Sequence, residues 1–95
     1  LEQIVKDNEK VMVQYGASWC GVCRVMKPKM KRLNDKFDGV TFVYVDAEKY
    51  PESRKLAKVD NLPTFAGFSK GELVNQVFGS KIEPVEELAN EIASH

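Results

Sequence analysis

Two apolar segments on either side of one long amphipathic segment constrain the fold of this chain most strongly. Residues 11–15 are almost entirely apolar, as expected of a central strand buried on both faces, and residues 40–45 carry the clearest strand pattern. Between them, residues 20–37 show an apolar stripe at helical spacing, formed by Met26, Met30, Leu33 and Phe37. This order predicts two parallel strands linked by a crossover helix.

Shorter segments complete the predicted fold. They are a helix from residue 1 to about 7, a helix over 51–58, a hairpin of strands 64–68 and 73–78 with Gly71 in its turn, and a last helix from about residue 83. Together they predict an α/β fold in a single domain, residues 1–95, with helices on both faces of one sheet. Pro28 lies inside the long helix and predicts a kink there, because proline lacks a backbone donor.

Composition argues against several classes of partner. The chain has 14 acidic and 14 basic residues, so no net field attracts nucleic acid or an anionic membrane. Its apolar runs are far too short to span a bilayer. We therefore expect no nucleic-acid partner and no membrane partner. Because the sequence starts at Leu1, a cleaved upstream signal stays open.

Both cysteines of the chain lie two residues apart at the predicted start of the long helix. A helix that begins at Cys20 exposes this sulfur at its N-terminus, where the helix dipole favours a thiolate, and places Cys23 behind it. We expect Cys20 to be the nucleophile and Cys23 the resolving thiol of a disulfide exchange. Two cysteines at this spacing fit a catalytic pair better than the disulfide framework of a secreted protein, which favours a cytoplasmic location.

The cysteine pair has two other interpretations. The pair could be half of a zinc site, but His95 at the chain end is the only other strong ligand candidate, so we expect no metal. An inert structural disulfide is the second interpretation, and it would stabilise little because the loop it closes is short.

Further motifs make the chain resemble the thioredoxin family over nearly its whole length. They are Ala17-Ser18-Trp19-Cys20-Gly21-Val22-Cys23, Pro28, Val45-Asp46, Leu62-Pro63-Thr64, Lys70-Gly71 and Phe78-Gly79. The resemblance implies a thioredoxin fold with a mixed four-stranded sheet in the order 2-1-3-4. It also implies that the Leu62–Pro63 bond is cis and faces the cysteines.

The resemblance further implies a function in which the dithiol reduces protein disulfides through a mixed disulfide. Substrate would bind at Trp19, Gly21, Val22, Leu62, Pro63 and Gly79, with Gln14 and Pro28 as structural support. The redox centre is the cysteine pair itself, so no dissociable cofactor is expected. The expected partners are disulfide-containing proteins and a separate electron donor resembling thioredoxin reductase, and the chain is expected to be a monomer.

Three positions depart from the pattern usual in the family. Val22 replaces a proline between the cysteines, Gln14 replaces a buried aspartate, and Phe42 replaces a lysine that faces this aspartate. Loss of both charged residues together indicates a consistent repacking. We expect Gln14 to be a core residue with satisfied hydrogen bonds. Without the carboxylate, Cys23 would lose its proton to water, hydroxide or the departing thiolate.

Two alternative functions stay open at this point. One is a disulfide oxidase or isomerase of an oxidising compartment, which a measured reduction potential would distinguish from a reductase. The other is a non-catalytic binding module that uses the surface around Trp19 and Pro63. This module would keep its function when the cysteines are changed to serine.

Overall fold

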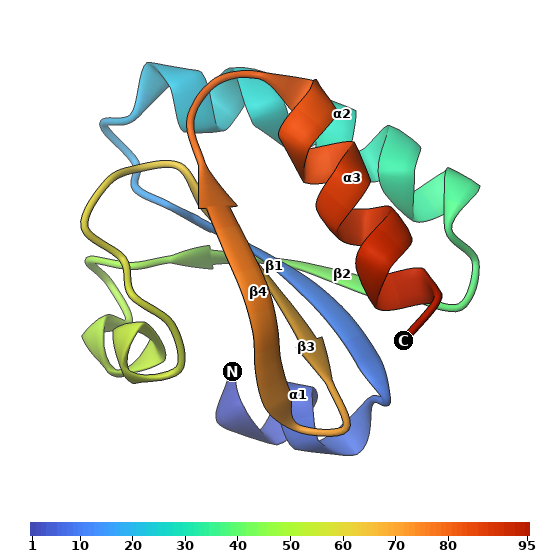
Figure 1. Cartoon of the computed structure of the whole chain (residues 1–95). Helices are drawn as coiled ribbons and strands as arrows, with labels where there is room; N and C mark the ends of the chain where they lie inside the picture. The colour runs from blue at the N-terminus through green and yellow to red at the C-terminus, as the bar shows by residue number, and fades with distance from the viewer.

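The computed structural model describes residues 1–95, and a four-stranded sheet runs through its centre (Figure 1). In chain order the elements are α1 (Glu2–Asp7), β1 (Lys10–Gly16), α2 (Gly21–Lys36), β2 (Thr41–Asp46), the 3₁₀ helix η1 (Pro51–Lys55), β3 (Thr64–Ser69), β4 (Glu72–Phe78) and α3 (Ile82–Ala93).

The strand order is β2-β1-β3-β4. β1 and β2 are parallel, whereas β3 is antiparallel to both β1 and β4. The mixed sheet and the order 2-1-3-4 are therefore confirmed, as is the crossover from β1 through α2 to β2. Because β1 and β2 run in the same direction, the residues that follow them emerge at the same edge of the sheet.

Each face of the sheet has its own core, because successive side chains of a strand point to opposite faces. On one face Val11, Val13 and Tyr15 of β1 pack with Val5 of α1 and with Ala57 after η1. On the other face Met12 of β1 and Phe65 of β3 pack under the apolar stripes of α2 and α3. Figure 1 shows α2 and α3 together over this second face. The helices thus cover both faces of the sheet.

The segment 51–58 differs from its predicted helix. The structure has only a 3₁₀ helix that ends at Lys55, with Pro51 in its first turn. The N–H of Leu56 donates to the carbonyl of Ser53 at 3.3 Å, the three-residue step of a 3₁₀ turn. Beyond it, Ala57 and Val59 are 7% and 5% exposed. Burial of both side chains takes the backbone away from a helical path.

The hairpin between β3 and β4 has the predicted turn. Ser69 pairs with Glu72, so two residues connect the strands. Both connecting residues have positive φ, 53° at Lys70 and 84° at Gly71, as a tight hairpin turn requires. α2 continues across Pro28 to Lys36, and the kink at Pro28 stays a prediction. No helix in the structure has the length and apolar character needed to cross a bilayer.

Candidate active site

The two cysteines lie at the end of the connection from β1 to α2 and in the first turn of α2, at the carboxyl edge of the parallel strands. Cys20 is the N-cap residue of α2, and the backbone N–H of Cys23 donates to its sulfur at 3.1 Å. The first turn of a helix has N–H groups without helical partners, so this position favours negative charge on Cys20 once the disulfide is reduced. The helix start predicted at Cys20 is confirmed.

Cys20 and Cys23 are joined in a disulfide, with their Cα atoms 5.3 Å apart. Cys20 retains 7% of its surface, whereas Cys23 is fully enclosed. The two sulfurs therefore differ in access from solvent, and the more accessible one belongs to the residue predicted to be the nucleophile.

Residues of the predicted substrate rim converge on the disulfide from distant parts of the chain. Leu62 packs against Ala17, Cys20 and Cys23. The Leu62–Pro63 bond is cis, as the family resemblance implied. The N–H of Gly79 donates to the carbonyl of Pro63 at 3.2 Å, and Gly79 has a φ of 120°, which favours glycine. The β3 and β4 ends are thereby connected next to the cysteines.

Exposed apolar side chains surround this centre. Trp19 is 66% exposed and Val22 is 42% exposed, while Gly21 is the first residue of α2. Val25 is 60% exposed and was not predicted as part of the site. Its position off the buried stripe of α2, three residues after Val22, is the sequence signal that could have found it.

Glu48 is a second residue that sequence reasoning missed. The indole Nε1 of Trp19 donates to Glu48 Oε1 at 2.7 Å. Glu48 is placed by a turn in which Asp46 Oδ1 accepts the N–H groups of Glu48 and Lys49 at 2.9 and 3.0 Å. These backbone hydrogen bonds, that of Lys49 first, hold the pKa of Asp46 below its usual value. The available signal was an acidic residue just after a strand parallel to β1.

Gln14 lies behind the disulfide with 1% of its surface exposed. Its Nε2 donates to the backbone carbonyl of Cys23 at 2.9 Å, but its Oε1 has no partner. The expectation of satisfied hydrogen bonds is therefore only half right. Phe42 of β2 lines the same groove as Gln14 and offers an apolar side chain rather than a donor. Pro28 is an exposed residue of α2, about two turns after Cys20, and its supporting role stays a prediction.

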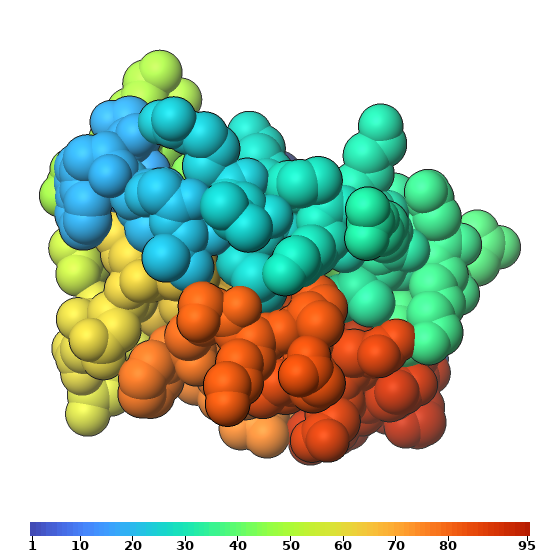
Figure 2. All heavy atoms as spheres, turned by 90° about the horizontal axis from the view of Figure 1, so that it is seen from above, coloured from blue at the N-terminus to red at the C-terminus, as the bar shows by residue number.

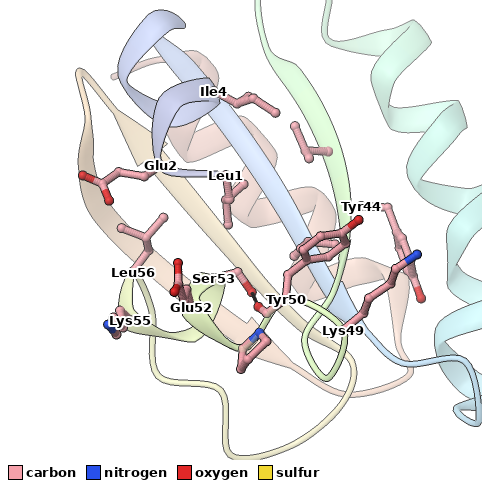
Figure 3. Close-up of a pocket in the computed structure, with 13 residues that line it drawn as sticks. Leu1, Glu2, Ile4, Tyr44, Lys49, Tyr50, Glu52, Ser53, Lys55 and Leu56 are labelled. Carbon is pink, nitrogen blue, oxygen red and sulfur yellow. Dashed lines mark hydrogen bonds between the residues drawn. The ribbon is translucent and has the colours of Figure 1, made fainter.

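One cavity of the structure lies away from the disulfide. It has a volume of about 560 Å³ and lies between α1, β2 and η1, with Leu1, Ile4, Tyr44, Tyr50 and Leu56 among its lining residues (Figure 3). No residue predicted to belong to the site lines it. The structure also contains no group of three or more His, Cys, Asp or Glu side chains placed to hold a metal ion.

Comparisons with known proteins agree with this geometry. The Thioredoxin family model matches residues 1–94. Rabbit thioredoxin (Oryctolagus cuniculus) is 35% identical over 85 residues, which are 90% of this chain and 81% of the relative. Thioredoxin H2 of Arabidopsis thaliana is 31% identical over 90 residues, which are 95% of this chain and 68% of the relative. Both relatives thus contain residues without a counterpart here.

A solved structure gives the same result. The oxidised form of mitochondrial thioredoxin 3 from Saccharomyces cerevisiae superposes with a TM-score of 0.88 at 28% identity, covering 95% of this chain and 85% of that one. A disulfide at the start of α2, an open rim around it and these relatives together support one chemistry, the exchange of thiols and disulfides. The chain therefore belongs to the thioredoxin family and is a thiol-disulfide oxidoreductase.

Proposed function

We propose that the chain reduces disulfides of protein substrates, with Cys20 as nucleophile and Cys23 as resolving thiol. The observation that carries the assignment is the asymmetry of the two sulfurs. Cys20 is the N-cap of α2 and accepts the N–H of Cys23, whereas Cys23 is fully buried beneath it. A substrate sulfur can therefore approach Cys20 first.

The proposed reaction has two exchange steps. In the first, the Cys20 thiolate attacks one sulfur of the substrate disulfide, forms a mixed disulfide and releases the other substrate sulfur as a thiolate. In the second, Cys23 loses its proton and attacks Cys20, which releases the second substrate thiolate and leaves the Cys20–Cys23 disulfide. Two electrons pass from the dithiol to the substrate, and the released thiolates take up protons.

Trp19, Gly21, Val22, Leu62, Pro63 and Gly79 form the surface on which the substrate lies in this proposal. The rim is open and largely apolar, which suits many protein disulfides better than one small molecule. The cysteine pair stores the electrons, so a dissociable cofactor is not required, and a separate electron donor of the thioredoxin-reductase type regenerates the dithiol. A monomer in the cytoplasm completes the proposal.

Single cysteine variants test the roles of the two sulfurs. Cys23→Ser is expected to accumulate a mixed disulfide with a disulfide-bonded protein substrate, because the second step is blocked. Cys20→Ser is the matched control and is expected to trap none. Mass spectrometry of the trapped species checks the linkage. If the conjugate forms through Cys23 in the Cys20→Ser protein instead, the assignment is reversed.

A redox titration against glutathione tests the proposed direction. Reductases of this kind have potentials near about −270 mV, whereas isomerases lie near about −180 mV. A value near the first supports reduction of substrates, and a value near the second supports the oxidase or isomerase alternative. A binding module would keep its partner when both cysteines are changed to serine, which a pull-down with that double variant would show.

A further inference from the structure

The charges of this chain are segregated between its two long helices, although acidic and basic residues balance overall. α2 contains six Lys or Arg residues and one acidic residue, whereas α3 contains four Glu residues and no basic one. The helices lie side by side over the same face of the sheet, with the cyan α2 next to the orange and red α3 in Figure 2. Although the net charge of the chain is zero, the surface of α2 is therefore strongly basic.

Most of the cations of α2 have no carboxylate partner. Lys36 pairs with Glu86 of α3 at 2.5 Å, and the other ion pairs of the structure lie outside α2. Four exposed residues make up what we name the α2 cationic surface: Arg24, Lys27, Lys31 and Arg32. The Arg24 guanidinium donates to the carbonyl of Ser18 at 3.1 Å, and Lys27 Nζ lies 4.3 Å from the centre of the Tyr44 ring. These neutral partners orient two cations without cancelling their charge.

The α2 cationic surface begins next to the redox centre. Arg24 is one helical turn from Cys20, and Lys31 is about 16 Å from Cys20 along the helix axis. About five residues of extended peptide span that length. Lys27 and Lys31 also line a groove of about 200 Å³ between α2 and β2, together with Asn34 and Tyr44. A substrate segment next to the attacked cysteine can thus reach Arg24, Lys27 and Lys31.

We propose that the α2 cationic surface binds an acidic segment of the protein substrate, within about five residues of the cysteine attacked by Cys20. The enzyme then reduces disulfides with Asp or Glu flanks faster than disulfides with neutral or basic flanks. This inference rests on the proposed reductase function and names the class of substrate that it prefers.

The form of the surface favours a short acidic protein segment over an extended polyanion. Exposed Val22 and Val25 lie beside Arg24 and offer apolar contacts that a protein segment can use. The neighbouring helix α3 carries four Glu residues, of which Glu86 pairs with Lys36 of α2. A nucleic-acid duplex or a flat anionic membrane would meet these carboxylates as well, and like charges repel.

Three disulfide-bonded peptides with one core sequence and glutamate, glutamine or lysine flanks provide the test. The reduced full chain is mixed with each peptide, and the second-order rate constant of reduction is followed by Trp19 fluorescence. We expect the glutamate peptide to react about tenfold faster than the glutamine peptide at low salt, and the lysine peptide to react slowest. At about 0.5 M salt the three rates should converge, because screening shortens the range of the interaction.

Variants assign the effect to the surface. Lys31→Gln combined with Arg32→Gln should remove most of the preference for the glutamate peptide and leave the rate with the glutamine peptide unchanged. Lys6→Gln combined with Lys55→Gln is the matched control, because it removes the same charge from α1 and η1 on the other face of the sheet. This control should keep the preference.

Equal rates for the three peptides at low salt would overturn the inference, as would a preference that survives in the Lys31→Gln, Arg32→Gln protein. Tighter binding of duplex DNA or phosphatidylserine vesicles than of the glutamate peptide, measured with the unmodified chain, would also overturn it. Failure to reduce even the glutamine peptide would instead contradict the proposed function, so the two failures are distinguishable.

Discussion

At the scale of single residues, Gln14 is the position where this chain differs most in chemistry from the pattern usual in its family. Its amide cannot take up a proton, and its Oε1 is buried without a partner beside the resolving cysteine. Gln14 therefore supplies no proton acceptor for Cys23.

Gln14→Asp introduces such an acceptor. We expect the variant to resolve mixed disulfides faster near pH 7, measured by stopped-flow mixing. Burial raises the folded pKa of the new carboxyl above its unfolded value of about 3.9. The variant then loses stability as pH climbs from the unfolded towards the folded pKa, by about 1.4 kcal/mol per unit of difference.

Gln14→Asn is the matched control for this prediction. It shortens the side chain in the same way and disturbs the hydrogen bond to the Cys23 carbonyl, but it cannot titrate. Resolution in the Asp variant that is no faster than in the Asn variant would mean that Gln14 is only a core residue. Denaturant melts of both proteins between pH 5 and 9 check the stability part.

Val22 is the second residue at which the chemistry of the pair can be tuned. It lies in the first turn of α2, where its N–H has no helical partner and can face the Cys20 thiolate. Proline at this position removes that donor while tolerating the helix start. Val22→Pro should therefore lower the reduction potential by tens of millivolts, and about 30 mV corresponds to about 1.4 kcal/mol. An unchanged or higher potential in the same glutathione titration would contradict this role.

At the scale of elements, α3 packs closely against β3 at Gly67. A Cβ added to Gly67 of β3 would lie 2.5 and 2.6 Å from Cγ1 and Cδ1 of Ile92, which is fully buried in α3. Gly67→Ala should lower the free energy of unfolding by about 1–3 kcal/mol, because the buried side chain of Ile92 or the helix that carries it must shift to make room. Denaturant unfolding measures the change.

Two further variants distinguish this clash from a general effect of alanine. Gly39→Ala adds a Cβ with no atom within 4 Å and should change stability by less than about 0.5 kcal/mol. Ile92→Ala should destabilise the Gly67→Ala protein less than it destabilises the parent, because the clash is relieved. Additive effects of the two substitutions would show that the side chains do not compete for space.

The elements also show what sequence alone could predict. β1, α2 and the hairpin were predictable because apolar periodicity and turn residues are local properties, and the cysteine spacing placed the redox pair at a helix start. The prediction of a helix over 51–58 was wrong, because burial of Ala57 and Val59 depends on contacts with distant strands. The hydrogen bond between Trp19 and Glu48 joins residues 29 positions apart, so no local pattern contained it.

At the scale of the whole molecule, one buried hydroxyl connects the core to the loop that leads towards the site. Tyr15 of β1 is fully buried, and its hydroxyl donates to the carbonyl of Ser53 in η1 at 2.9 Å. Burial raises the pKa of Tyr15 from 10.0 to about 12. The folded chain therefore holds this proton at a pH where the unfolded chain has lost it.

Alkaline unfolding should reveal this difference. A group whose folded pKa is raised stabilises the fold fully below its unfolded pKa, so the contribution of Tyr15 is complete below pH 10.0 and is lost as pH rises to about 12. In this window the free energy of unfolding should fall by up to about 1.4 kcal/mol per pH unit from this group alone. Tyr15→Phe should be less stable at neutral pH by about 0.5–1.5 kcal/mol, since it lacks the hydrogen bond, yet the difference in stability from the parent should become smaller as pH rises.

Tyr44→Phe is the control, because Tyr44 is only half-buried on the edge strand and should alter the slope less. Urea melts of the three proteins from pH 8 to 12 measure these slopes, and parallel curves for the parent and Tyr15→Phe would show that the Tyr15 hydroxyl does not set the alkaline limit of the fold.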